Sequence, residues 1–101
     1  MRFSNEFGFY ELNPFPGCNQ IVISNHSFID KDSRGKGFGD NEHKRRLAQI
    51  HDLRYDYVLC TCRDDNVPQI KILEKNGWKR LDSFVNRETE HSVSLWGHRI
   101  E

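Results

Sequence analysis

Apolar and polar residues alternate along several short stretches of the chain, as they do in β-strands with one covered face. Two such stretches come first, at residues 7–12 and 20–29, and a turn with Pro and Gly is expected between them at residues 13–17. Three more strands are expected further along, at residues 55–62, 78–85 and 92–100. The strand at residues 55–62 is apolar on both faces, which predicts a central position with cover on both sides.

The first helical period appears in the middle of the chain. Leu47, Ile50 and Leu53 recur every three residues, which predicts a helix over residues 40–53. The expected apolar stripe consists of Leu47, Ala48, Ile50 and Leu53, and Lys44, Arg45 and Arg46 fall outside it.

A second helix is expected over residues 67–76. Asn66 can cap its start, and Gly77 is suited to the left-handed conformation that often ends a helix. Ile70 and Leu73 share the face that should turn inward.

The expected order is strand, strand, helix, strand, helix, strand, strand. Strand–helix–strand units imply parallel neighbours, and the hairpins at the two ends imply antiparallel ones. We therefore expect an α/β (α+β) fold, with a mixed twisted sheet of about five strands and two main helices. A chain of 101 residues fits one domain, spanning residues 1–101.

Composition narrows the class of protein. Aromatic residues make up 12% of the chain, too many for a typical disordered protein. The apolar stretches, such as residues 21–23, are far shorter than the roughly 20 residues that a membrane helix needs. We also expect no leader peptide, because the first residues lack a basic region followed by an apolar run.

The cysteines and histidines argue against disulfides and metal. The three cysteines, an odd number, are Cys18, Cys60 and Cys62. Cys60 and Cys62 share one face of a strand, which is not a natural disulfide geometry, so we expect reduced thiols and a cytoplasmic protein. The five histidines are scattered without zinc spacing, so no metal is expected.

The segment that can carry chemistry is the glycine-rich stretch at residues 30–39, which reads DKDSRGKGFG. It follows a strand and precedes a helix, so uncovered backbone N–H groups and the helix N-terminus can together bind a phosphate. Arg34 and Lys36 add positive charge. The segment is neither a Walker loop nor a dinucleotide fingerprint, and the alternative is an ordinary flexible turn.

Two motifs in this chain resemble those of one enzyme family. Arg34-x-x-Gly37-x-Gly39 resembles the R/Q-x-x-G-x-G/A signature of the GNAT superfamily, the Gcn5-related N-acetyltransferases. Residues 66–78, which read NVPQIKILEKNGW, are similar to the N-x-x-S/A-x-x-x-(Y/L)-E-K-x-G-F motif of the same family. The order, the spacing and the intervening strand agree, and the resemblance covers about residues 20–100.

The resemblance implies an acetyl-CoA-dependent N-acetyltransferase that acts on a primary amine of a protein or a small molecule. Acetyl-CoA would be the co-substrate, with no metal. The cofactor-binding residues implied by the motifs are Phe28, Ile29, Arg34, Gly35, Lys36, Gly37, Phe38, Gly39, Asn66 and Lys75. Asn66 could instead be an ordinary N-cap.

This chain departs from the family pattern in several places. Two helices that usually precede the first hairpin are missing, so the acceptor side should be open or completed by a partner. Leu73 stands where a tyrosine general acid is common in the family. In having leucine there, the chain is more similar to the subgroup that modifies ribosomal-protein N-termini. Gln69 replaces a usual Ser or Ala, and Arg54 a common helix-ending glycine. The alternative function is therefore a catalytically weak GNAT-like module that binds CoA or a partner protein.

His26 is the candidate general base, because it lies on the second expected strand near the right depth. The alternatives for His26 are an exposed or packed strand residue, with water as the proton acceptor. Cys60 and Cys62 could reach the thioester, but they also suit the core as small apolar residues.

The basic run at residues 43–46 allows three interpretations. It can be a solvated helix face, or it can bind the 3′-phosphate of CoA together with Lys36. A nucleic-acid surface comes third, because zero net charge gives no long-range attraction to DNA or RNA. A homodimer formed across a sheet edge also remains open.

Overall fold

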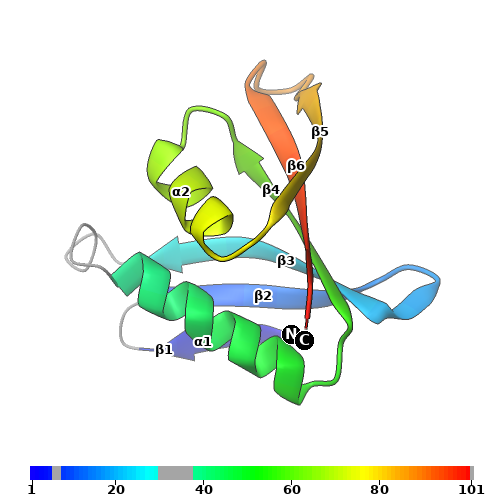
Figure 1. Ribbon diagram of the computed structural model, residues 1–101. Coiled ribbons are helices and arrows are strands. Elements are labelled where there is room, and N and C mark those ends of the chain that lie inside the picture. Colours follow the sequence, from blue (N-terminus) through cyan, green and yellow to red (C-terminus); the bar gives the residue numbers. More distant parts are fainter. Residues whose placement is uncertain (6–7, 30–37, 101) are drawn as a thin grey trace.

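Six strands form one mixed sheet in the computed structural model, and two helices accompany it (Figure 1). The model describes residues 1–5, 8–29 and 38–100, with the side chains of residues 5, 25–29 and 38–39 outside the description. The elements are β1 (Arg2–Asn5), β2 (Gly8–Phe15), β3 (Cys18–Ile29), α1 (Phe38–Asp52), β4 (Tyr57–Arg63), α2 (Val67–Lys75), β5 (Lys79–Val85) and β6 (Ser92–Arg99). The strands lie in the order β1-β2-β3-β4-β6-β5, which confirms the mixed sheet and the two helices.

The first strand was not expected from the sequence. β1 pairs antiparallel with β2, and its Phe3 lies opposite Tyr10 with the two rings stacked at 5.2 Å between centroids. A four-residue strand with one large apolar side chain is too short to show a period of two. The described residues therefore form six strands, where about five were expected.

The first turn is shorter than expected. β2 continues through Asn13, Pro14 and Phe15, so that only Pro16 and Gly17 form the turn. Pro14 is tolerated because β1 pairs only with residues 8–11 of β2. At the proline, the edge of β2 that faces away from β3 has no neighbouring strand, so no backbone N–H is needed there. Gly17 has φ +82°, the left-handed conformation that favours glycine.

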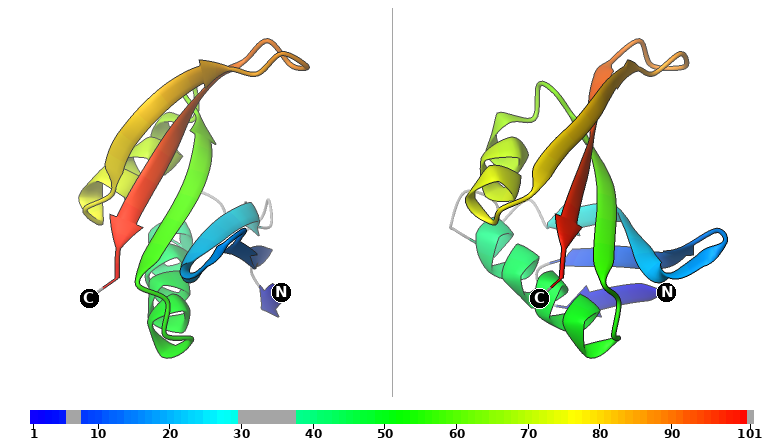
Figure 2. Two further views of the ribbon diagram at one scale, coloured as in Figure 1. Left: turned by 90° about the vertical axis from the view of Figure 1, so that its right-hand side faces the viewer. Right: turned by 45° about the vertical axis from the view of Figure 1, so that its right-hand side comes forward.

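Both helices cover the same face of the sheet (Figure 2). Leu12, Val22 and Val58 are completely buried on that face, and α1 and α2 contribute the buried Ile50 and Leu73 to the same core. The two helices share a face because both crossovers join parallel strands, and such crossovers are right-handed.

β4 is central, as expected, but it is covered on one face alone in the described part of the chain. Tyr57 and Leu59, which point to the other face, are half-buried and have no described helix over them. The expectation of cover on both sides was wrong because apolar residues on both faces do not by themselves require two helical layers.

The inward face of α1 is more polar than expected. Leu47, Ile50 and Leu53 pack against the core as predicted, whereas Ala48 is exposed. The basic run divides between two environments. His43 is 2% exposed and the Arg46 guanidinium turns toward the sheet, so the prediction that Arg46 lies outside the inward face is wrong.

Both tryptophans belong to the core. Trp78 is 5% exposed and Trp96 is 4% exposed. The indole N–H of Trp78 donates a 2.8 Å hydrogen bond to Nε2 of His43, which joins α1 to the end of α2. The three cysteines are free thiols, and Cys62 is buried.

The two helices end in the same backbone arrangement with different residues. At the end of α2, Gly77 has φ +83°, and the N–H of Trp78 donates to the carbonyl of Leu73 at 3.0 Å. At the end of α1, Arg54 has φ +66°, and the N–H of Tyr55 donates to the carbonyl of Ile50 at 3.3 Å. These are Schellman ends, in which glycine is usual and other residues are strained.

Arg54→Gly is therefore expected to stabilise the chain by roughly 0.5–1 kcal/mol, because glycine adopts the left-handed conformation without strain. Chemical denaturation measures the free energy of unfolding. Arg54→Ala is the matched control and should give no gain, because alanine keeps the strain while losing the same side chain. Equal stabilities of the Gly and Ala variants would contradict this explanation.

Candidate functional site

The central feature of the candidate site is an opening between β3 and β4. The two strands pair in parallel only where residues 21–23 lie opposite residues 57–59. Beyond these positions β3 continues to Ile29 and β4 to Arg63, and the two strands diverge (Figure 1). We call this opening the splay.

The splay exposes backbone groups on rigid strands. The edges of β3 and β4 that face away from the splay stay paired. β3 pairs with β2 as far as Ile29, and β4 pairs with β6 as far as Arg63. Within the splay, the facing N–H and C=O groups of β3 and β4 do not pair with each other, so an extended ligand can hydrogen-bond to them.

Both helices begin at the edge where the splay opens. α1 starts at Phe38, beyond the carboxyl end of β3, and α2 starts at Val67, shortly after the carboxyl end of β4. Ligands of open α/β sheets bind at this edge, and helix N-termini favour anions there. An anionic, extended ligand is therefore the kind of molecule that this edge suits.

The predicted phosphate segment falls at this edge but is only partly described. Arg34, Gly35, Lys36 and Gly37 lie outside the described residues. Phe28 and Ile29 end β3, while Phe38 and Gly39 begin α1, and only their backbones are described. The candidate base His26 lies in the part of β3 that does not pair with β4. Only its backbone is described.

Asn66 caps α2, as the alternative interpretation expected. Its Oδ1 accepts a 3.3 Å hydrogen bond from the backbone N–H of Gln69. Its contact with a cofactor stays a prediction.

Asn66→Asp separates these two roles. The variant should keep the stability of the parent, because aspartate caps a helix as well as asparagine does. If Asn66 also donates a hydrogen bond from its amide to CoA, affinity should fall by roughly tenfold, about the value of one hydrogen bond. Calorimetric titration with CoA measures this, and Asn66→Ser serves as a second capping variant. Unchanged affinity in both variants would leave Asn66 with the capping role alone.

Lys75, the other predicted cofactor residue from this motif, joins the two helices. Its Nζ lies 3.1 Å from Oδ2 of Asp40, in the first turn of α1. The carboxylate of Asp40 also accepts a 3.1 Å hydrogen bond from the side-chain amide of Asn76 and forms an ion pair with Lys44 at 3.3 Å. The hydrogen bond from Asn76, followed by that from Lys75, lowers the pKa of Asp40 to about 2. The carboxylate is thus compensated, and positive charge remains near the start of α1.

The carboxyl end of β4 is fixed by Asp64, which sequence reasoning missed. The hydroxyls of Ser92 and Ser94 donate to its carboxylate, and Nη2 of Arg80 lies 2.8 Å from its Oδ1. These hydrogen bonds, that from Ser92 above all, lower the pKa of Asp64. The cluster holds β4 to β5 and β6, away from β3, and so helps to keep the splay open.

The side chains at two candidate catalytic positions are unreactive at neutral pH. Leu73, at the position of the absent tyrosine, is 1% exposed and belongs to the core. Burial raises the pKa of the Cys60 thiol to about 12, so that it is protonated at neutral pH. Neither residue can supply a proton or a nucleophile readily.

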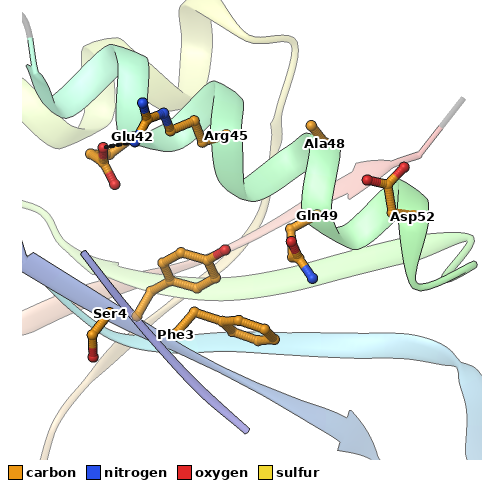
Figure 3. Close-up of a pocket in the computed structure, with 8 residues that line it drawn as sticks. Phe3, Ser4, Glu42, Arg45, Ala48, Gln49 and Asp52 are labelled. Carbon is orange, nitrogen blue, oxygen red and sulfur yellow. Dashed lines mark hydrogen bonds and ion pairs between the residues drawn. The ribbon is translucent and has the colours of Figure 1, made fainter.

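Two cavities flank α1. One, of about 370 Å³, lies between α1 and strands β1 and β2, with Phe3 and Ser4 on one side and Glu42, Arg45 and Asp52 on the other (Figure 3). The other, of about 650 Å³, lies near the carboxyl ends of α1 and β6. Asn66 and Lys75, the predicted cofactor residues whose side chains the structure describes, line neither of the two.

Residues 1–5, 8–29 and 38–100 contain neither a membrane-spanning helix nor a metal-binding cluster. Neither helix there has both the length and the apolar character that crossing a membrane requires. In the same residues, no three side chains of His, Cys, Asp or Glu gather as a metal site would need.

No protein-family model matches the chain, and no curated protein matches it by sequence. Solved structures match its fold closely. The ribosomal-protein-S18-alanine N-acetyltransferase from Escherichia coli is 11% identical over 100% of this chain and 69% of its own, with a TM-score of 0.80. A Salmonella typhimurium protein assigned as an acetyltransferase, solved with its cofactor acetyl-CoA, is 13% identical over 94% of this chain and 58% of its own, with a TM-score of 0.80.

A GNAT-family acetyltransferase from Streptococcus pneumoniae is 16% identical over 94% of this chain and 60% of its own, with a TM-score of 0.78. The chain thus has the fold of GNAT acetyltransferases, which confirms the resemblance seen in the two motifs. It spans less than two thirds of the length of two of these three proteins.

Proposed function

We propose that this chain is an acetyl-CoA-dependent N-acetyltransferase that acetylates a primary amine. The observation that carries the proposal is the splay between β3 and β4, with the N-termini of α1 and α2 at its open edge. The pyrophosphate of acetyl-CoA would bind residues 34–39 at the start of α1. The pantetheine would follow the unpaired edges of the strands, which places the thioester at the narrow end of the splay.

The acceptor amine would approach from the sheet face that the described helices leave open. On this face Tyr57, Leu59 and Leu95 are half-buried, and the exposed Phe84 follows on β5. An open, partly apolar face suits a polypeptide acceptor better than a small polar amine. A solved protein with this fold is named for acetylating an alanine of a ribosomal protein, which agrees with a polypeptide N-terminus as the acceptor here.

The proposal is tested by release of the CoA thiol from acetyl-CoA in the presence of candidate amines. Peptides with free N-termini should give release well above the rate without amine, and the same peptides with blocked N-termini should not. Polyamines test the small-molecule alternative in the same assay. Binding of acetyl-CoA without thiol release from any amine would overturn the enzymatic function.

That outcome would favour the second candidate function, a module that binds CoA or a partner protein without useful turnover. One observation supports it: Leu73, at the position where the motif resemblance would place a tyrosine acid, is an aliphatic side chain buried in the core. Affinity for CoA with no effect of amines would distinguish this module from the enzyme.

A further inference from the structure

Arg46 is a cationic side chain that the fold does not explain. It lies on α1, and its guanidinium turns toward the sheet, where Nη1 is 3.4 Å from the hydroxyl of Ser24. Its guanidinium carbon lies 4.9 Å from the centre of the Tyr10 ring. Its Nε is buried and has no hydrogen-bond partner. A buried guanidinium usually has its donors satisfied by a carboxylate, so this arrangement is unusual.

The position of Arg46 coincides with the narrow end of the splay. Ser24 is the first residue of β3 beyond the last position that pairs with β4, and Cys60 is the first such residue of β4. Arg46 contacts Ser24 and interacts electrostatically with Cys60. The guanidinium therefore reaches the helix-covered face of the sheet from α1, over β2 and β3, beside the residue of β3 where the two strands begin to separate.

Among the described residues, the charged or titratable groups near Arg46 do not neutralise it fully. Glu42, one turn earlier on α1, interacts electrostatically with Arg46, but it also forms an ion pair with Arg45 at 3.4 Å. Tyr10 and Cys60 are both neutral near pH 7, because burial raises the pKa of each. His43 on α1 is also neutral, as burial lowers its pKa to about 4. Burial lowers the pKa of Arg46 itself, as expected for a cation that is incompletely paired.

We propose that Arg46 stabilises the thiolate of CoA as it leaves the acetyl group. This inference rests on the proposed function, which places the thioester at the narrow end of the splay. It gives the reaction a positive charge beside the sulfur in place of the proton that Leu73 cannot donate. A fixed charge shielded from water, as the Nε of Arg46 is, is worth far more than the same charge in solution.

The step balances without a proton from Arg46. The amine nitrogen attacks the carbonyl carbon of the thioester and forms the new C–N bond. The C–S bond breaks, and its electron pair stays on sulfur, which becomes the thiolate next to the guanidinium. The proton lost by the nitrogen goes to water or to a base. The products are the N-acetylated amine and CoA as its thiolate.

The test measures the pKa of the CoA thiol while CoA is bound. The ultraviolet absorbance of the thiolate is followed against pH, and the complex with desulfo-CoA is subtracted to remove the protein's own signal. In the parent protein the bound thiol should titrate at least about one pH unit below the ~8.5 of a free thiol. In Arg46→Met it should titrate above the free value, because burial then acts without the cation. Arg46→Lys should restore most of the lowering.

Arg87→Met is the matched control, because Arg87 is exposed in the turn at residues 86–91. The thiol of CoA bound to this variant should titrate at the same pH as the thiol of CoA bound to the parent. Thermal melting checks that Arg46→Met is folded, and an apolar side chain of similar length in this buried place should not lower the melting temperature.

The outcomes separate the two proposals. A bound thiol in the parent that titrates at or above the free value would overturn the role of Arg46, as would a lowered value that persists in Arg46→Met. In either case CoA binds and the proposed function stands. Absence of CoA binding to the parent would overturn the proposed function and this inference with it.

Discussion

Gly37→Val is expected to abolish the binding of acetyl-CoA. The GNAT resemblance assigns the backbone N–H groups of residues 34–39 to the pyrophosphate, and a branched side chain at residue 37 would obstruct its approach. Loss of two or more hydrogen bonds to a charged group costs about 3 kcal/mol or more, which is roughly a hundredfold in Kd.

Isothermal calorimetry with CoA measures this loss. The variant should keep the circular dichroism spectrum and melting temperature of the parent, because the core is built from strands and helices on either side of the segment. Lys31→Val, which precedes the motif, is the control and should bind CoA with near-parental affinity. Parental affinity in Gly37→Val would contradict the assignment of the pyrophosphate to this segment.

Acid is expected to destabilise the chain through His43, beginning near pH 6.5, above the pH at which carboxylates start to titrate. His43 is 2% exposed, and its Nε2 accepts the hydrogen bond from Trp78, so that only the neutral ring fits. Burial, followed by the charge of Arg46, lowers its pKa from 6.5 to about 4. Between these two pH values the unfolded chain binds a proton that the folded chain excludes, so stability falls as the pH is lowered.

The size of the loss follows from the difference between the two pKa values. It reaches about 3 kcal/mol near pH 4, a large share of the stability of a small domain. Urea denaturation at a series of pH values measures it. His43→Gln can still accept from Trp78 but does not titrate, so its stability should be nearly flat between pH 6.5 and 4. His51→Gln, at an exposed position, should keep the parental slope, and the same slope in His43→Gln would exclude His43 as the cause.

Much of the fold could be predicted because most elements carry a clear period or a distinct end. Asn66 and Gly77 mark the two ends of α2, and the apolar pattern of residues 57–62 marks the central strand. β1 could not be predicted, because its stability comes from pairing with β2 and from the ring of Phe3 on Tyr10 rather than from its own pattern.

The candidate site could be predicted only in part. The sequence shows where a phosphate segment lies but not how far two strands stay paired, which depends on side chains distant in the chain, such as Asp64 and its serine donors. The helix period alone placed Arg46 outside the buried face. An apolar stripe indicates which residues can be buried, but it does not indicate which polar residues find partners inside, as His43 does with Trp78.

A crystal structure of the chain with acetyl-CoA would locate the cofactor relative to the splay. We expect the pyrophosphate against residues 34–39 and the thioester sulfur at the narrow end of the splay, between Ser24 and Cys60 and within reach of Arg46. Acetyl-CoA bound instead in a cavity beside α1, with β3 and β4 unoccupied between them, would contradict this placement.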